Sequence, residues 1–224
     1  MALRAHDVLA FDVYGTLVDT GGVVDRLSHV VGDDARAFSD AWRQHQLGYS
    51  WRRALMRDYV DFGTCTAQSL DHTAARFGAT LSDDDRDDLL ATYRRLPAFP
   101  DVAPALARLA ARGLRLVAFT NGPVAAGDEL LTSAGVRAHL ADVVSTDEIR
   151  SFKPDPAVYH HLLERVATRA ARVVVVSSNS FDVLGAKHAG LQGAWVRRTE
   201  ADVLDPWDVE PDVTIAGLGD LAAD

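Results

Sequence analysis

The sequence predicts an α/β fold, in which a doubly wound parallel sheet is interrupted after its first strand by a block of helices. The apolar run Val8-Leu9-Ala10-Phe11 has the length and composition of a buried parallel strand. Residues 19–97 then carry apolar side chains at three- and four-residue spacing, which is typical of helices. From residue 101 to 215 strand and helix patterns alternate, which favours a parallel sheet covered by helices on both faces.

The inserted block contains only helical patterns. Ser50 precedes the third predicted helix, and Ser82, with Asp85 three residues later, precedes the fifth as a weaker form of the capping box. Gly63 and Gly78 lie where helices are expected to end. The predicted helices span residues 23–31, 34–47, 51–62, 67–77 and 82–94.

After Pro97 and Pro100 the pattern changes to that of a sheet with crossover helices. Asp155 followed by Pro156 is a typical helix start. The predicted strands span 114–120, 143–145, 173–177, 194–196 and 213–215, and the helices between them span 101–112, 124–134, 155–167 and 180–189. We therefore expect a Rossmann-like core domain at 1–18 and 98–224, and an inserted α-helical cap domain at 19–97.

Composition narrows the range of functions. The 224 residues carry a net charge of −9 and are 48% hydrophobic, which disfavours a nucleic-acid-binding surface. The apolar runs are too short to cross a bilayer, and the first residues lack a signal-peptide pattern. The single cysteine, Cys65, excludes an internal disulfide and suits a reducing compartment. We expect a cytoplasmic protein that binds neither nucleic acid nor membrane.

Polar side chains follow the predicted strands at their carboxyl ends. Because the carboxyl ends of parallel strands meet at one edge of the sheet, these side chains should face a single crevice. Each has an ordinary structural explanation when taken alone, such as a surface lysine or a helix-start residue. Their order and spacing together favour a catalytic site. The residues are Asp12, Thr120, Asn121, Lys153, Ser177, Asn179 and Asp182.

The segment VLAFDVYGTLVDT at residues 8–20 resembles the first motif of the haloacid dehalogenase superfamily, whose aspartate is a covalent nucleophile. Most members are phosphatases with a second aspartate two residues later, and here that position is Tyr14. The segment from Trp42 to Phe62 is similar to the cap of the L-2-haloacid dehalogenases. That resemblance implies that Arg43 binds the halide.

The same resemblance implies the lining of the substrate pocket. It places Gln44, Leu47 and Phe62 beside Tyr14, although packing within the cap explains Leu47 and Phe62 about equally well. It also assigns substrate binding to Tyr159 and Phe181. Phe181 stands where a tryptophan is common in the family, so the range of substrates is open.

The reaction implied is a two-step displacement. Asp12 attacks the carbon that bears the halogen, and an aspartyl ester forms while Arg43 and Asn121 stabilise the departing halide. Lys153 keeps Asp12 ionised beside the substrate carboxylate. Further roles are assigned in the same way. Thr120 and the backbone N–H groups of Val13 and Tyr14 hold the substrate carboxylate, and Thr16 fixes Asp12. Asp182, oriented by Ser177 and Asn179, deprotonates the water that attacks the ester carbonyl and not the substrate carbon, so the overall reaction proceeds with inversion.

The sequence leaves several other functions open. A Mg²⁺-dependent phosphatase is disfavoured by Tyr14 and by Ser178, because phosphatases of the superfamily have acidic groups there. We expect no metal and no cofactor. A hydrolase of another activated C–X bond and a catalytically silent binding protein are further alternatives. The resemblance also suggests a homodimer, with Trp42, Trp51 and Tyr59 either at its contact or buried in the cap.

Overall fold

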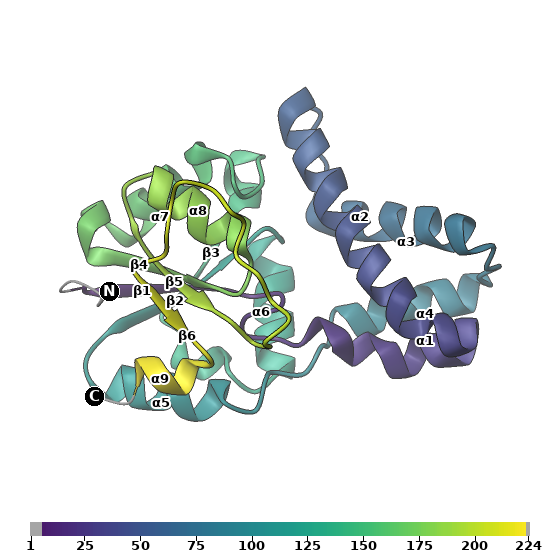
Figure 1. The fold of residues 1–224 in the computed structure, drawn as a ribbon, viewed down its shortest axis with the longest axis horizontal. Coiled ribbons are helices and arrows are strands. Elements are labelled where there is room, and N and C mark those ends of the chain that lie inside the picture. Colours follow the sequence, from purple (N-terminus) through teal and green to yellow (C-terminus); the bar gives the residue numbers. More distant parts are fainter. Residues whose placement is uncertain (1–5, 223–224) are drawn as a thin grey trace.

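The computed structural model describes residues 6–222, so the parts of the predicted core at 1–5 and 223–224 lie outside the described residues. Within them, six parallel strands form one sheet in the order β3-β2-β1-β4-β5-β6 (Figure 1). The strand β1 pairs with β2 on one side and with β4 on the other, so the chain extends the sheet in both directions and the sheet is doubly wound. The strands are β1 (Val8–Asp12), β2 (Arg115–Thr120), β3 (Asp142–Ser145), β4 (Val173–Ser177), β5 (Gln192–Val196) and β6 (Val213–Ile215).

Alternating side chains of β1 pack into two different cores, as expected for a strand buried on both faces. Leu9 and Phe11 belong to one core, and Val8 and Ala10 to the other. The first core includes residues of α5 (Val102–Ala111), α6 (Val124–Ser133) and α9 (Leu218–Leu221), and the second includes residues of α7 (Pro156–Val166) and α8 (Ser180–His188). The Rossmann-like architecture predicted for the core is confirmed.

A helical block lies beside the sheet and is joined to it by two adjacent segments (Figure 1). The chain leaves through Asp19 and returns through Pro97, whose carbonyl accepts a hydrogen bond from the Asp19 N–H at 2.8 Å. The N–H of Phe99 similarly bonds to the carbonyl of Leu17. The block contains η1 (Thr20–Val23), α1 (Val24–Val31), η2 (Gly32–Asp34), α2 (Ala35–Met56), α3 (Phe62–Phe77) and α4 (Asp83–Tyr93).

Two predicted helix boundaries in this block are wrong. The predicted helices 34–47 and 51–62 are joined in α2, because the Ser50 hydroxyl donates to the carbonyl of Leu47 instead of capping a new helix. Gly63 does not end a helix but lies in the first turn of α3, which Asp61 caps by accepting from the N–H of Thr64. The short α9 is a further element that the sequence pattern did not indicate.

Several local signals act as predicted. Ser82 accepts from the N–H of Asp85, and Asp155 caps α7 with Pro156 at its first position. Gly78 ends α3 with φ of 65°, a conformation that glycine adopts without strain. No helix among the described residues is both long and apolar enough to span a membrane.

The aromatic side chains proposed for a subunit contact have partners within the chain. Trp42 is 1% exposed, and its indole donates to the carbonyl of Thr66. Trp51 contacts Phe181, and the Tyr59 ring stacks on Phe152. The exposed apolar side chains of the block are instead Leu55, Met56 and, to a lesser degree, Phe77.

Candidate active site

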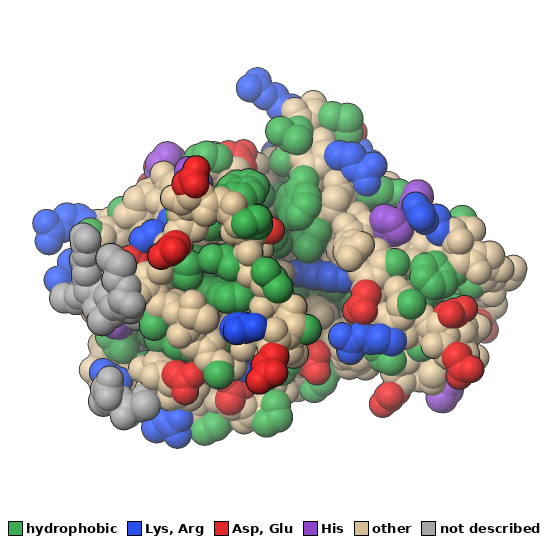
Figure 2. All heavy atoms as spheres, in the orientation of Figure 1, with side chains coloured by type: hydrophobic (Ala, Val, Ile, Leu, Met, Phe, Trp, Pro, Cys, Tyr) green, Lys and Arg blue, Asp and Glu red, His purple; other side chains and the backbone are tan. Residues whose placement is uncertain are grey.

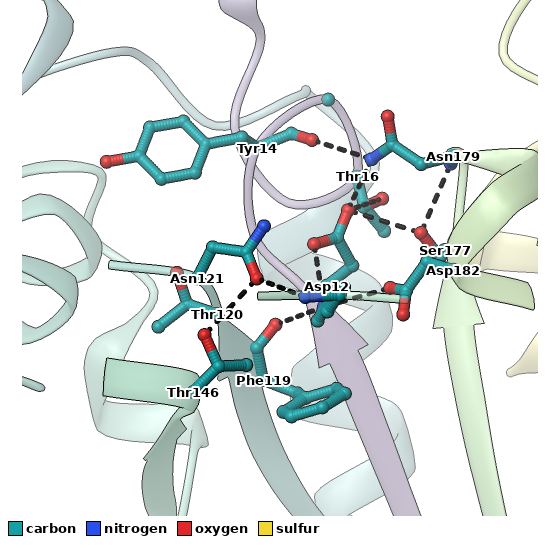
Figure 3. A network of polar contacts seen from close by, with 12 residues as sticks. Asp12, Tyr14, Thr16, Phe119, Thr120, Asn121, Thr146, Ser177, Asn179 and Asp182 are labelled. Atoms are coloured by element: carbon teal, nitrogen blue, oxygen red, sulfur yellow. Dashed lines mark hydrogen bonds and ion pairs between the residues drawn. The ribbon is translucent and has the colours of Figure 1, made fainter. Parts of the chain in front are cut away.

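Asp12 ends β1 and lies at the centre of a polar network at the carboxyl edge of the sheet (Figure 3). One carboxylate oxygen accepts from Lys153 Nζ at 3.0 Å. The other accepts from Thr16 Oγ1 at 2.9 Å, Ser177 Oγ at 3.2 Å and Asn179 Nδ2 at 2.7 Å. With 7% of its surface exposed, Asp12 is held in one orientation by these four donors.

The loop after Asp12 is folded tightly against β4. The Val13 carbonyl accepts from the N–H groups of Leu17 and Val18, and Gly15 adopts φ of 85°, which a side chain would disfavour. Ser178 ties the loop down, since its N–H donates to Thr16 Oγ1 and its hydroxyl to the Gly15 carbonyl. The Thr16 hydroxyl therefore fixes both the Asp12 side chain and its loop.

Lys153 is a buried cation, 1% exposed, between two carboxylates. Its ammonium group donates to Asp12 at 3.0 Å, to Asp182 at 2.9 Å and to the carbonyl of Phe119 at 2.7 Å, which uses all three of its protons. Burial lowers the pKa of Lys153, but Asp12 and Asp182 raise it by more, so that this pKa lies above its ordinary value. Lys153 is thus a fixed positive charge beside Asp12.

Asp182 lies deeper than the sequence suggested, with no exposed surface. Its oxygens accept from Lys153 and from the Tyr159 hydroxyl at 2.9 Å. The prediction that Ser177 and Asn179 orient Asp182 is wrong, because both donate to Asp12. Burial raises the pKa of Asp182 above its ordinary value in spite of the opposing effect of Lys153.

Tyr159, which the family resemblance assigned to substrate binding, lies in the core beneath Asp182. Its side chain is fully buried in the core, packs edge-on against Phe119 with ring centroids 5.8 Å apart, and reaches Asp182 from behind. Gly185 in α8 makes room for it, since an added Cβ would lie 2.3 Å from the Tyr159 hydroxyl. Tyr159 therefore contacts Asp182 and not the crevice.

Asn121 and Thr120 continue the site from the end of β2. The Asn121 side-chain oxygen accepts from the Lys153 N–H at 2.9 Å and from Thr146 Oγ1 at 3.3 Å. This arrangement directs the Asn121 amide nitrogen toward the Tyr14 side of the site (Figure 3). Thr120 Oγ1 accepts from the N–H of Gly122 at 3.1 Å, which holds the turn between them.

Arg43 reaches the Asp12 loop from α2. Its Nη2 lies 3.5 Å from the Tyr14 carbonyl, its guanidinium carbon lies 5.9 Å from the Tyr14 ring centroid, and its Nη1 donates to Gln46 at 2.6 Å. Figure 2 shows that the surface is hollowed between the sheet and the helical block, with a basic side chain in the depth. Arg43 and Asp12 thus come from opposite walls of the crevice.

Aromatic side chains line the region around Tyr14. Its ring stacks on Tyr93 with centroids 5.6 Å apart and lies 5.7 Å from Phe62, which is 3% exposed. Burial raises the pKa of the Tyr14 hydroxyl, so it stays neutral. Gln44 is exposed and Leu47 half-buried, and their spacing places both on the α2 face that carries Trp51.

Two residues of the site were missed in the sequence. The Trp51 indole donates to the Lys153 carbonyl at 3.1 Å, and its ring meets the predicted Phe181 edge-on at 5.2 Å. Gln46 contacts Arg43 from within the helical block. Their spacing from Arg43 along one helix could have indicated that they lie near the site, but the same spacing is expected of residues that pack in the core of the block.

The comparisons with known proteins agree with this geometry. Residues 6–190 match the family model described as haloacid dehalogenase-like hydrolase. The chain is similar to the (S)-2-haloacid dehalogenase of Pseudomonas sp. (strain YL), at 34% identity over 94% of this chain and 90% of the relative. It is also 34% identical to haloacetate dehalogenase H-2 of Moraxella sp. (strain B), with 95% of each chain covered. The solved structure of the Xanthobacter autotrophicus L-2-haloacid dehalogenase with chloropropionic acid covalently bound is similar over 97% of both chains, with a TM-score of 0.92 and 32% identity.

Proposed function

The chain belongs to the haloacid dehalogenase-like hydrolases, and we propose that it is an (S)-2-haloacid dehalogenase. It hydrolyses L-2-haloalkanoic acids to D-2-hydroxy acids and halide, with no metal or cofactor. The observation that carries the proposal is the environment of Asp12: a buried carboxylate, held by Lys153 and three neutral donors, that faces Arg43 across the crevice.

In the first step, Asp12 attacks the carbon that bears the halogen. The new C–O bond forms an ester, the C–X bond breaks, and the electron pair leaves with the halide. Negative charge therefore moves from Asp12 toward the opposite wall of the crevice. Arg43 and the amide nitrogen of Asn121 lie where they would stabilise that charge.

The substrate carboxylate must bind close to a second negative charge. Lys153 offsets this repulsion because it is fixed 3.0 Å from Asp12. We assign the substrate carboxylate to Thr120 and to the backbone N–H groups of Val13 and Tyr14, next to the nucleophile. Gln44, Leu47, Phe62 and Phe181 form the rest of the pocket in this proposal.

In the second step, water attacks the ester carbonyl carbon of Asp12 and the bond from that carbon to the product oxygen breaks, so the hydroxyl group remains on the face opposite the lost halide. The attacking water loses a proton and the departing alkoxide gains one. The water needs a proton acceptor, and the raised pKa of Asp182 suits that role. Both Asp182 oxygens are occupied before reaction. We propose that, once esterification has removed the charge of Asp12, Lys153 stays paired with Asp182, and a second lone pair of an Asp182 oxygen accepts the proton of the water.

A phosphatase is the alternative that the site disfavours. Departure of an alkoxide from phosphate requires a proton, and in the superfamily pattern an acid stands where this chain has Tyr14, whose pKa is raised. Ser178, at the position of a second expected acid, donates instead to the loop carbonyl of Gly15. A haloacid carries one negative charge, which Lys153 suffices to balance, and the group that leaves when its ester forms is a halide, which needs no proton.

One assay tests this function. Free halide is measured with L- and D-2-chloropropionate, chloroacetate and bromoacetate, each with and without a chelator. We expect release from the L enantiomer and from the haloacetates, unaffected by the chelator, and little from the D enantiomer. Mg²⁺-dependent hydrolysis of an aryl phosphate, with no halide released from any haloacid, would assign the phosphatase function instead.

We further propose that the sheet and the helical block act as a core domain (1–18 and 98–224) and a cap domain (19–97), and that the protein is a cytoplasmic homodimer. Exposed Leu55 and Met56, at the end of α2, support a contact between two copies. A molecular mass in solution equal to one chain at every concentration would contradict the dimer and leave the catalytic proposal intact.

A further inference from the structure

Gln46 is a polar side chain with no exposed surface in the helical block. It lies three residues after Arg43 in α2, which places the two side chains on neighbouring parts of one helix face. Burying an amide costs free energy unless its oxygen and nitrogen find hydrogen-bonding partners. The partners of Gln46 therefore indicate why a glutamine stands there.

The orientation of the Gln46 amide follows from Thr66. The Thr66 hydroxyl donates its single proton to the carbonyl of Phe62 at 2.8 Å. It must then accept from Gln46, whose Nε2 lies 2.6 Å away. The side-chain oxygen of Gln46 consequently faces the other way, where it accepts from Arg43 Nη1 at 2.6 Å and from the Tyr93 hydroxyl at 3.1 Å.

The groups that hold Arg43 are neutral. They are the side-chain oxygen of Gln46, the backbone carbonyl of Tyr14 and the Tyr93 hydroxyl, and no carboxylate within residues 6–222 forms an ion pair with this arginine. Other arginines of the block, at positions 26, 53 and 86, each pair with an aspartate. Arg43 is thus fixed in place while its positive charge stays available to an anion in the crevice.

We propose that Gln46 is a positioning residue for Arg43: its side-chain oxygen, oriented by Thr66, holds the guanidinium at the Asp12 loop without neutralising it. The anion that Arg43 would bind is the halide that leaves in the first step, and in this respect the inference rests on the proposed function. A carboxylate at position 46 would hold the guanidinium equally well but would compete with the halide for its charge.

The experiment compares three variants with the wild-type protein. Gln46→Met removes the oxygen while keeping an unbranched side chain of similar length, and Thr66→Val removes the hydroxyl that orients the amide. Gln68→Met is the matched control, because Gln68 also accepts from an arginine, Arg53, but on the exposed surface of the block. Bromide affinity is measured by calorimetry without substrate, and kcat and KM are measured with L-2-chloropropionate.

We expect Gln46→Met to weaken bromide binding and to lower kcat, each by about 10- to 100-fold, the range that loss of a hydrogen bond to a charged group corresponds to. KM should change less, because the substrate carboxylate binds elsewhere. Thr66→Val should act in the same direction and more weakly, whereas Gln68→Met should match the wild type. Wild-type bromide affinity and kcat in both Gln46→Met and Thr66→Val would overturn the proposal.

Gln46→Glu adds a readout that a merely structural role would not move. Its carboxyl group should pair with Arg43, so bromide binding should be nearly normal at low pH and should weaken as the pH rises and the carboxyl ionises. A bromide affinity independent of pH in this variant would contradict the inference. If the wild type released no halide from any haloacid, the proposed function would fail, while the bromide measurements would still decide the role of Gln46.

Discussion

Replacing Lys153 by methionine is the most informative single change, because it removes the buried cation and leaves both of its carboxylates. Asp12 and Asp182 contact the same nitrogen at 3.0 and 2.9 Å, so their facing oxygens lie no more than about 6 Å apart. Two charges at that separation repel by about 3 kcal/mol at an effective dielectric constant of 20. Breaking a buried ion pair by removing one partner typically costs about 3–5 kcal/mol.

The sign of the pH dependence follows from the carboxyl groups. Without Lys153, the pKa of Asp182 in the folded state, which burial already raises, should rise further above the unfolded value of about 3.9. A carboxyl whose folded pKa is raised stabilises the folded state below its unfolded pKa, and this contribution is lost as the pH rises toward the folded pKa. For one retained proton the slope is about 1.4 kcal/mol per pH unit. The variant should thus nearly match the wild type at pH 4 and be less stable by about 4 kcal/mol at pH 7.

Urea unfolding, followed by tryptophan fluorescence from pH 4 to pH 8, measures this difference. Arg36→Met is the control, since the Arg36 guanidinium pairs with Asp40 at 3.2 Å and both side chains are exposed. Such pairs contribute about 0–1 kcal/mol, so the control should lose little stability at any pH. Equal losses for Lys153→Met at pH 5 and pH 8 would refute the reasoning, as would a control that behaves in the same way.

Three further predictions concern the reaction. After a single turnover in ¹⁸O-water with enzyme in excess, the label should be found in the Asp12 peptide; an unlabelled peptide beside a fully labelled product hydroxyl would mean that water attacks the substrate directly. Asp182→Asn should slow ester hydrolysis by about 100-fold or more and let the esterified peptide accumulate, whereas equal slowing of halide release and ester hydrolysis would contradict its role. Trp51→Phe keeps an aromatic ring but loses the hydrogen bond to the Lys153 carbonyl, so kcat should fall by up to about tenfold. The exposed Trp207→Phe should leave kcat unchanged, and a similar fall in both variants would show that the Trp51 contact has no special effect.

The convergence of the site could be predicted because it depends on topology. Apolar runs of strand length, separated by helical patterns, specify a parallel sheet, and the carboxyl ends of its neighbouring strands share one edge. Asp12 ends β1, and Lys153 lies in the connection that follows β3, between η4 (Thr146–Ile149) and α7. Topology therefore predicted the edge of the sheet at which both lie, while the contact between them depends on the path of that connection.

The pairing of individual side chains could not be predicted in the same way. Closeness in the sequence suggested that Ser177 and Asn179 orient Asp182, but the register of the sheet decides otherwise. Phe11 is paired with Val176 in the parallel ladder, so the next residues, Asp12 and Ser177, end adjacent strands side by side. Asp182 lies in the first turn of α8 and points into the core toward Tyr159.

The helical block was the least predictable part, because its local signals conflict with its packing. Gly48 and Ser50 weaken a helix locally, yet α2 continues through both. Its apolar face packs along α3, where Trp42 reaches the carbonyl of Thr66. Tertiary packing of this kind overrides propensities of a few tenths of a kilocalorie per mole.

Asp182 also affects the energetics of the proposed first step through its contact with Lys153. Lys153 stabilises the charged form of Asp12 before reaction, and by itself this would oppose the transfer of charge to the halide. Because Lys153 also contacts Asp182, its positive charge stays paired as the charge on Asp12 disappears. Arg43, which forms no ion pair with a carboxylate among residues 6–222, gains a partner at the same moment. Lys153 therefore faces an anion both before and after the C–X bond breaks, whereas Arg43 faces one only afterwards, and both effects favour moving one negative charge across the crevice.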